Sequence, residues 1–295
     1  MKKLLVTGGN GFIARHLVEQ LSGKFEIVSR NSRDLNLLDA DAVRDCIEAG
    51  AYDVVVHTAT WDAAPKHSTK DPAKIVENNL RMFFNVARCE DYFGRMLYFG
   101  SGAEFDREHW VPRMKEEYFD RYVPSDRYGF SKYIMTKYAL ENKKIYNLRL
   151  FAVFGRYEDY LVRFISNACC HAVLGLPIRI RQNARYDFLD ITDLAKIVAW
   201  FIETAPRANV YNICTGAVHE FKAIAGEINR ISGKKLDIIV QADGLGREYG
   251  GDNTLLTEEM EGFAFRPLAE SVRELYGWYE LHKRSIDRDA LLASV

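Results

Sequence analysis

Short apolar runs alternate with longer amphipathic stretches along the first half of the chain. The runs "KLLVTGG", "FEIVSR", "YDVVVHTA", "RMLYFGS" and "IYNLRLFAVFG" are predicted strands, and stretches with helical spacing separate them. Strands that alternate with helices form a parallel sheet with both faces covered. The sequence therefore predicts an α/β fold built on a doubly wound parallel sheet. The helix over residues 39–49 is expected to begin at Asp39 or Asp41.

A glycine-rich turn, "TGGNGFIA", follows the first predicted strand and opens the first predicted helix. Gly8 and Gly11 let the backbone turn tightly and approach a pyrophosphate, whose charge is stabilised at a helix N-terminus. Ala14 stands where a third glycine is usual, and it is still small. The turn predicts a dinucleotide site in a Rossmann sheet, and the alternative is a plain strand-to-helix turn.

The alternation changes after Gly155. Residues 160–175 are predicted to be helical and residues 176–182 to form a short strand. Residues 186–204 are expected to return to the main sheet as a strand, followed by a helix that begins near Asp193. The sequence thus predicts a Rossmann domain for the cofactor and a smaller, discontinuous C-terminal α/β lobe for the substrate. The Rossmann domain is expected over residues 1–155 plus about 186–216, and the lobe over about 156–185 plus 217–295.

The end of the second predicted strand bears on which dinucleotide is bound. An NAD site needs a carboxylate there to accept hydrogen bonds from the ribose 2′-hydroxyl. This chain has Arg30 and Arg33 before its first acid, Asp34. A guanidinium suits a 2′-phosphate by charge and by its fork of donors. The pattern favours NADP(H) and leaves NAD possible, and the alternative is that both arginines are only solvated loop residues.

Charge and cysteine content argue against several kinds of partner. Lys+Arg 40 against Asp+Glu 41 gives a net charge of -1, so no basic excess indicates nucleic acid or a membrane surface. The N-terminal "LLV" is too short for a signal peptide, and no apolar run approaches the ~20 residues of a membrane helix. The five cysteines have no metal-binding spacing, so we expect no metal site and a reducing cytoplasm.

With "TGGNGFIA" near its start and "YGFSK" near its middle, the chain resembles the extended short-chain dehydrogenase/reductase family. Members of that family act on nucleotide sugars as epimerases, dehydratases and reductases. Further matches to its motifs follow in order along essentially the whole chain: "VVVHTAT", "ENNL", "LYFGSGAEF", "LRLFAVFG", "YDFLDITDLA" and "VYNICTG". The resemblance implies a nucleotide-diphosphate sugar as substrate. It also implies a homodimer whose helices over residues 75–92 and 128–142 form a four-helix bundle.

The resemblance assigns site residues one by one. Tyr128 and Lys132 take the places of the family's catalytic tyrosine and lysine, and Ser101 that of its catalytic hydroxyl. Arg247, in "REYGGD", resembles an arginine that holds the diphosphate in epimerases. The residues expected at the cofactor are Gly8, Asn10, Gly11, Phe12, Ile13, Arg30, Arg33, Asn36, Leu37, Thr58, Ala59, Asn79, Tyr128 and Lys132.

These catalytic residue types suit hydride transfer to a ketone, which leaves an alkoxide in need of a proton. A free tyrosine has a pKa near ~10, and an ammonium one helical turn away stabilises its anion. Lys132 is therefore expected to tune Tyr128 as the acid, while Ser101 polarises the carbonyl from a strand end. The alternative is that Tyr128 and Lys132 are an ordinary exposed aromatic residue and cation.

Departures from the family's motifs narrow the reaction. Gly102 and Ala103 stand where dehydratases carry an Asp-Glu pair, and Glu104 is one place too late, on the opposite face of a strand. "RDLNLLD" resembles GDP-fucose synthases, but Ala103 replaces their base cysteine and "RYEDYLVRF" lacks their histidine. Ala152 replaces an asparagine that often contacts the sugar nucleotide, which leaves the nucleotide base open.

The sequence therefore predicts NADPH-dependent reduction of the 4-keto group of a nucleotide-diphosphate 4-keto-6-deoxy sugar, without 3,5-epimerisation. A nucleotide-sugar 4-epimerase that retains NAD is the first alternative. A catalytically silent NADP-binding regulator is the second, although such proteins commonly lose the tyrosine or the lysine. Trp61 and Asp62, just past the third strand, are expected to touch the sugar. His57 and the pair Cys169-Cys170 are expected to be buried packing residues.

Overall fold

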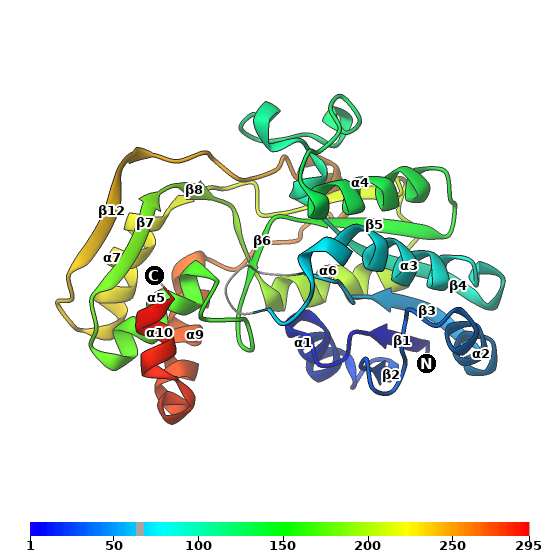
Figure 1. Ribbon diagram of the computed structural model, residues 1–295, viewed down its shortest axis with the longest axis horizontal. Helices are drawn as coiled ribbons and strands as arrows, with labels where there is room; N and C mark the ends of the chain where they lie inside the picture. Colours follow the sequence, from blue (N-terminus) through cyan, green and yellow to red (C-terminus); the bar gives the residue numbers. More distant parts are fainter. Residues whose placement is uncertain (63–67, 295) are drawn as a thin grey trace.

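The main sheet of the protein is parallel and has six strands, and it lies at the right of Figure 1. The structure is a computed structural model, and it describes residues 1–62 and 68–294. The strand order is β10-β5-β4-β3-β1-β2, and every pairing in this sheet is parallel. The strands are β1 (Lys3–Thr7), β2 (Glu26–Arg30), β3 (Tyr52–His57), β4 (Phe93–Ser101), β5 (Ile145–Leu150) and β10 (Val210–Ile213). The predicted doubly wound α/β fold is confirmed.

Helices cover both faces of this sheet, because alternate residues of each strand enter different apolar cores. Leu4 and Val6 of β1 pack with α1 (Phe12–Leu21) and α6 (Ile191–Glu203). Leu5 between them packs on the opposite face, in a core that also contains residues of three other helices. These helices are α2 (Ala40–Gly50), α3 (Ile75–Ala87) and α4 (Arg127–Leu140). Asp39, one of the two expected caps, begins α2 by accepting the amides of Asp41 and Ala42.

The strand order reverses between β1 and β3. From β1 the chain moves to β2 on one side, and it then crosses to β3 on the other. The loops that leave the carboxyl ends of β1 and β3 therefore meet: a Cβ added to Gly8 would lie 3.0 Å from backbone atoms of Ala59. In open α/β sheets such a reversal is where ligands bind.

A second apolar core lies outside the main sheet, at the left of Figure 1. Ile180, Ile224 and Leu275 are among its buried residues. It is built from α5 (Phe164–Leu174), β7 (Ile178–Asn183), α7 (Phe221–Ser232), β12 (Ile238–Leu245), α9 (Leu268–Leu281) and α10 (Arg288–Ala293). Leu256, in α8 (Thr254–Glu259), instead packs in the core on the α1 face of the main sheet. The domain boundaries expected from the sequence stay a prediction.

The predicted return of residues 186–204 to the main sheet is wrong for its strand. β9 (Phe188–Asp190) pairs in parallel with β6 (Ala152–Phe154), in a separate two-stranded sheet. It cannot join beside β5, because β4 and β10 already occupy both edges of that strand. The helix that follows, α6, does return to the main sheet. It begins at Ile191 with Asp190 as its cap, earlier than the expected start near Asp193.

The remaining short strands, β8 (Arg185–Tyr186) and β11 (His219–Glu220), pair with one another. Within residues 1–62 and 68–294, no helix is both long and apolar enough to cross a bilayer. Cys169 and Cys170 are fully buried in α5, as predicted for packing residues. Leu140, near the end of α4, is a large apolar residue on the surface. The homodimer through α3 and α4 stays a prediction, which sedimentation equilibrium would test.

Candidate active site

The turn between β1 and α1 is shaped to admit an anion. Gly8 has a φ of +70°, a conformation that favours glycine, and an added Cβ would crowd Ala59 and the Thr58 hydroxyl at 3.0 Å. Gly11 caps α1 without a side-chain hydrogen bond, and the first turn of the helix contains no acidic residue. Its amide groups are therefore left for a ligand. Asn10 is exposed on this turn, and Phe12 and Ile13 are half-buried beside it. These features fit a pyrophosphate.

The end of β2 lies against this turn. The amide of Gly9 donates to the carbonyl of Arg30 at 2.9 Å, which fixes the strand end beside the glycines. Arg30 and Arg33 are exposed, and neither forms an ion pair with any of the described residues. Asn36 is also exposed, whereas the side chain of Leu37 is buried in the core beneath α2 and α3. Two guanidinium groups without an ion-pair partner among the described residues thus lie at and just after the end of β2, beside the glycine turn.

Asn79 of α3 holds the loop that follows β3. Its side-chain oxygen accepts the amide of Trp61 at 2.6 Å, and its side-chain nitrogen donates to the Ser131 hydroxyl at 3.2 Å. Thr58 donates to the carbonyl of Thr7 at 2.7 Å, which ties the loop to β1. The buried amide of Asn79 is therefore engaged with protein atoms, and it supports the expected cofactor site by positioning the loop. The Trp61 indole donates to the carbonyl of Asp71 at 3.1 Å.

His57, at the end of β3, is a buried core residue as predicted. Only 3% of its surface is exposed, and its Nδ1 lies 3.0 Å from the hydroxyl of Thr7. Burial lowers the pKa of His57 to about 3, and the positive charge of Lys132 adds to this effect. The imidazole is therefore neutral near pH 7, and it serves as a hydrogen-bonding partner within the sheet.

The three predicted catalytic residues lie together where β4 ends beside α4. Ser101 is the last residue of β4, and Tyr128 lies in the first turn of α4, which Asp126 caps by accepting the amide of Gly129. The Ser101 hydroxyl lies close enough to Tyr128 to lower the pKa of that tyrosine. The buried Lys132 ammonium donates to the carbonyl of Phe99 at 2.8 Å and lies 5.7 Å from the centre of the Tyr128 ring.

The electrostatics of this group differ from the expected tuning of Tyr128 by Lys132. Burial raises the pKa of Tyr128, the negative charge of Asp62 raises it further, and Arg163 and the nearby Ser101 hydroxyl lower it. The Lys132 ammonium is drawn to the strand carbonyl of Phe99 instead of the tyrosine hydroxyl. Burial lowers the pKa of Lys132 to about 8, against the raising effects of Glu104 and Asp62. Tyr128 is therefore protonated near pH 7, the form that donates a proton.

Tyr249 is a site residue that the sequence reasoning missed. A Cβ added to Gly102 would lie 2.7 Å from the Tyr249 hydroxyl, and Ser101 lies close enough to Tyr249 to lower its pKa. Burial raises the pKa of Tyr249 to about 12. Its ring lies between Trp110 and Phe151, with centroid distances of 4.9 and 5.5 Å. Tyr249 stands two residues after Arg247 in "REYGGD", but the sequence gives no sign that it reaches Ser101, because the contact forms only when a distant segment folds.

Two charged groups expected at the substrate lie beside this centre with partners of their own. Arg247 is exposed, and its guanidinium donates to the carbonyl of Arg107. Asp62 lies 3.8 Å from the guanidinium of Arg163, the residue before α5. Asp62 and Arg163 thus join the loop after β3 to the second core, close enough to Tyr128 for both charges to affect its pKa.

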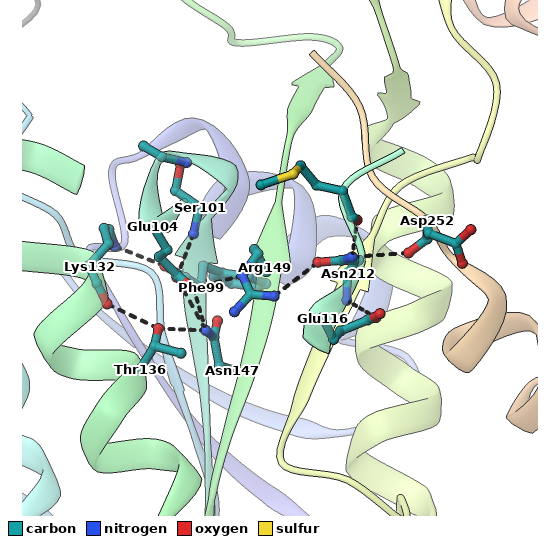
Figure 2. A network of polar contacts seen from close by, with 12 residues as sticks. Phe99, Ser101, Glu104, Glu116, Lys132, Thr136, Asn147, Arg149, Asn212 and Asp252 are labelled. Atoms are coloured by element: carbon teal, nitrogen blue, oxygen red, sulfur yellow. Dashed lines mark hydrogen bonds and ion pairs between the residues drawn. The ribbon is translucent and has the colours of Figure 1, made fainter. Parts of the chain in front are cut away.

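Glu104 lies beneath Ser101 and does not face a substrate. Gly102–Glu104 form a single 3₁₀ turn, so strand alternation does not apply to Glu104 as the sequence analysis assumed. The turn folds the carboxylate back to accept the amide of Ser101 at 2.9 Å and Arg149 Nε at 2.7 Å, as Figure 2 shows. Both side chains of the ion pair are 0% exposed. The two positions after Ser101, Gly102 and Ala103, carry no carboxylate.

Known proteins share this arrangement of elements. A model of the NAD dependent epimerase/dehydratase family matches residues 4–214. A dTDP-4-dehydro-6-deoxy-D-allose reductase from a Streptomyces species is 25% identical, over 96% of this chain and 98% of that protein. The structure of the GDP-mannoheptose C4 reductase from Campylobacter jejuni with NADP bound superposes with a TM-score of 0.82, at 18% identity over 95% of this chain and 98% of that one. A GDP-L-fucose synthetase from Naegleria fowleri gives a TM-score of 0.81, at 17% identity over 97% and 95% of the two chains.

Proposed function

The chain belongs to the NAD dependent epimerase/dehydratase family, and from this premise we propose that it is an NADPH-dependent reductase. The proposed substrate is a nucleotide-diphosphate 4-keto-6-deoxy sugar, which is reduced at C4 without 3,5-epimerisation. One observation carries the proposal: Ser101 and a protonated Tyr128 converge at one strand end, while the acid nearest in sequence, Glu104, is sealed in an ion pair. The similarity to a dTDP-4-dehydro-6-deoxy-D-allose reductase supports the same class of reaction.

Different residues of this chain would bind the cofactor, orient the carbonyl and donate the proton in such a reduction. Gly8 and the first turn of α1 would bind the pyrophosphate of the cofactor, and Arg30 with Arg33 its 2′-phosphate. The bound dinucleotide supplies the hydride. Ser101 donates a hydrogen bond that orients and polarises the substrate carbonyl. Tyr128 gives its phenolic proton to the carbonyl oxygen as that oxygen becomes an alcohol, and the charge of Lys132 favours the resulting phenolate.

The reaction is tested by mixing the protein with NADPH and the GDP-, dTDP- and CDP-4-keto-6-deoxyhexoses in turn. Oxidation of NADPH with at least one of them, giving a 4-hydroxy sugar with unchanged C3 and C5, is the expected result. A protein that oxidises NADPH with none of the three would refute the proposal. NAD that co-purifies with the protein, together with interconversion of 4-hydroxy sugars, would instead indicate a 4-epimerase.

The two free arginines predict the cofactor preference. Replacing Arg30 and Arg33 together with Ala is expected to raise the Kd for NADPH about 10–100-fold, because charge-assisted hydrogen bonds contribute ~1.5–3 kcal/mol. The Kd for NADH should change little, and both constants can be measured by cofactor fluorescence. Arg44→Ala is the matched control, since Arg44 is an exposed arginine of α2 paired with Asp41. Equal losses for both cofactors would contradict a 2′-phosphate contact.

The close packing around Gly102 predicts that a carboxylate side chain, as dehydratases carry there, cannot be introduced at this position. A Cβ there would lie 2.7 Å from the Tyr249 hydroxyl and 2.8 Å from the Phe151 ring. Gly102→Ala should therefore reduce the free energy of unfolding by about 1–3 kcal/mol, as overpacking does, and urea denaturation would measure it. Gly226→Ala is the control, because nothing lies within 4 Å of a Cβ at this position in α7, and it should stabilise by ~0.4–1 kcal/mol. Equal effects of the two changes would contradict the close packing.

A further inference from the structure

Glu104 is part of the polar network that Figure 2 shows around Ser101 and Lys132. Its carboxylate contacts the backbone amide of Ser101. Its Oε1 accepts the Ser101 amide at 2.9 Å, and its Oε2 accepts Arg149 Nε at 2.7 Å. The side-chain nitrogen of Asn147 lies 3.2 and 3.1 Å from the two oxygens. Both carboxylate oxygens are thus bound, and water has no access to them because the side chain is 0% exposed.

These contacts fix the backbone from which the Ser101 hydroxyl projects. Glu104 accepts the Ser101 amide while the Ser101 hydroxyl accepts the amide of Ala103 at 3.2 Å, so the turn is closed from both directions. The preceding residue must be glycine for this packing. A Cβ added to Gly100 would lie 2.1 Å from both Glu104 Oε1 and the Asn147 side-chain oxygen. A shift of the carboxylate would therefore move Ser101.

The same network reaches Lys132. The side chain of Asn147 donates to the Thr136 hydroxyl at 2.7 Å, and that hydroxyl donates to the carbonyl of Lys132 at 3.0 Å. The Lys132 ammonium in turn is bound to the carbonyl of Phe99, two residues before Ser101. Burial lowers the pKa of this ammonium to about 8, and the negative charge of Glu104 already favours its charged form at that value.

We propose that Glu104 is a positioning residue, which orients Ser101 through its backbone and keeps Lys132 charged. The inference rests on the proposed reductase function for the roles of these two residues. The titratable and charged groups that face Lys132 are Glu104, Asp62, His57, Tyr98 and Tyr128. Arg149 balances the charge of Glu104, so the pair is neutral as a whole and its carboxylate still acts on the lysine.

Two double variants separate the two roles without leaving an unpaired charge in the interior. Glu104→Gln with Arg149→Met removes both charges, and the glutamine oxygen can still accept the Ser101 amide. Glu104→Leu with Arg149→Met removes the acceptor as well. Three properties are measured for each variant: thermal unfolding, the pH dependence of kcat, and the titration of Lys132 by NMR of protein with ¹³C-labelled lysine. The NMR titration needs no substrate.

The glutamine double variant should titrate Lys132 up to about one pH unit lower than the unchanged protein, because the loss of the Glu104 charge is only partly offset by the loss of Arg149. The alkaline limb of kcat should move in the same direction, because activity is lost as pH rises through the pKa of Lys132. The leucine double variant should lose kcat in addition, approaching about 10²-fold, since a misplaced hydroxyl costs that much. Unchanged kcat and an unchanged Lys132 titration in folded double variants would overturn the proposal.

Two further variants test whether the changes in kcat and in the Lys132 titration come from Glu104 itself. Glu104→Asp keeps the charge opposite Arg149 but shortens the reach to Ser101, so kcat should fall while the Lys132 titration stays close to that of the unchanged protein. It remains decisive if the double variants do not fold, and an unchanged kcat would contradict the positioning role. Glu259→Gln is the control: its side chain is 6% exposed and accepts the Tyr211 hydroxyl of the edge strand β10, and it should move neither readout. Absence of any activity in the unchanged protein would refute the proposed function, and the Lys132 titration would still test the charge effect of Glu104.

Discussion

Replacing Tyr128 with Phe is expected to lower kcat for NADPH oxidation by about 10²–10⁴-fold, the usual contribution of a positioned general acid. The phenylalanine ring keeps the packing of the first turn of α4, and only the hydroxyl beside Ser101 is lost. The Kd for NADPH should therefore stay within about threefold of its original value. Initial rates of NADPH oxidation and a fluorescence titration with NADPH measure the two quantities.

The pH dependence of kcat for the unchanged enzyme also tests the roles of Tyr128 and Lys132. Because burial holds the pKa of Tyr128 above its ordinary value, this residue stays protonated through the neutral range. Lys132 has a pKa lowered to about 8, so it loses its charge as pH rises above that value. Activity should consequently fall on the alkaline side of pH ~8, where Lys132 deprotonates.

Tyr138→Phe is the matched control for the Tyr128 variant. Tyr138 lies in the same helix, three turns closer to its C-terminus. It is 36% exposed, and its ring packs against Phe83 and Phe84. Its loss of a hydroxyl should leave kcat unchanged. If Tyr128→Phe also kept full activity, Tyr128 would not be the proton donor. If the unchanged protein had no activity either, a silent NADP-binding regulator would account for both results.

The parts of the fold that the sequence predicted depend on local patterns. The continuous apolar run of β1 indicated a strand buried on both faces, and Leu4 and Leu5 do enter opposite cores. Gly8 was identified by the turn that follows that strand, and its φ of +70° explains why glycine is required. The spacing of Tyr128 and Lys132 in one helical turn was likewise visible in five residues.

The parts that could not be predicted depend on contacts between residues far apart in the chain. The strand β9 has the same apolar character as a sheet strand, but it pairs with β6, and β5 has no open edge beside which it could lie. Tyr249 reaches Ser101 from a segment more than a hundred residues away. The partner of Glu104 lies 45 residues along, in β5, so the sequence could place this acid near Ser101 but could not show that Arg149 seals it.

Arg149→Met is expected to lower the free energy of unfolding by about 3–5 kcal/mol, the typical effect of breaking a buried ion pair. Arg149 is 0% exposed, and its Nε and Nη1 donate to Glu104 and Asn212 at 2.7 and 3.1 Å. Its guanidinium also lies 4.4 Å from the centre of the Phe105 ring. Methionine fills much of this space, but it leaves the Glu104 carboxylate without a counter-charge in a site that water does not reach. Urea denaturation of the variant measures the loss.

The surface pair of Arg185 and Glu220 provides the control for this prediction. Arg185 also forms a 2.8 Å ion pair with a glutamate, but the two side chains are 46% and 37% exposed. Arg185→Met should cost only about 0–1 kcal/mol, because water solvates the remaining carboxylate. Adding Glu104→Gln to Arg149→Met should recover most of the lost stability, since neither charge of the ion pair then remains buried. A loss for Arg149→Met no larger than that for Arg185→Met would mean that Glu104 takes up a proton or gains access to water.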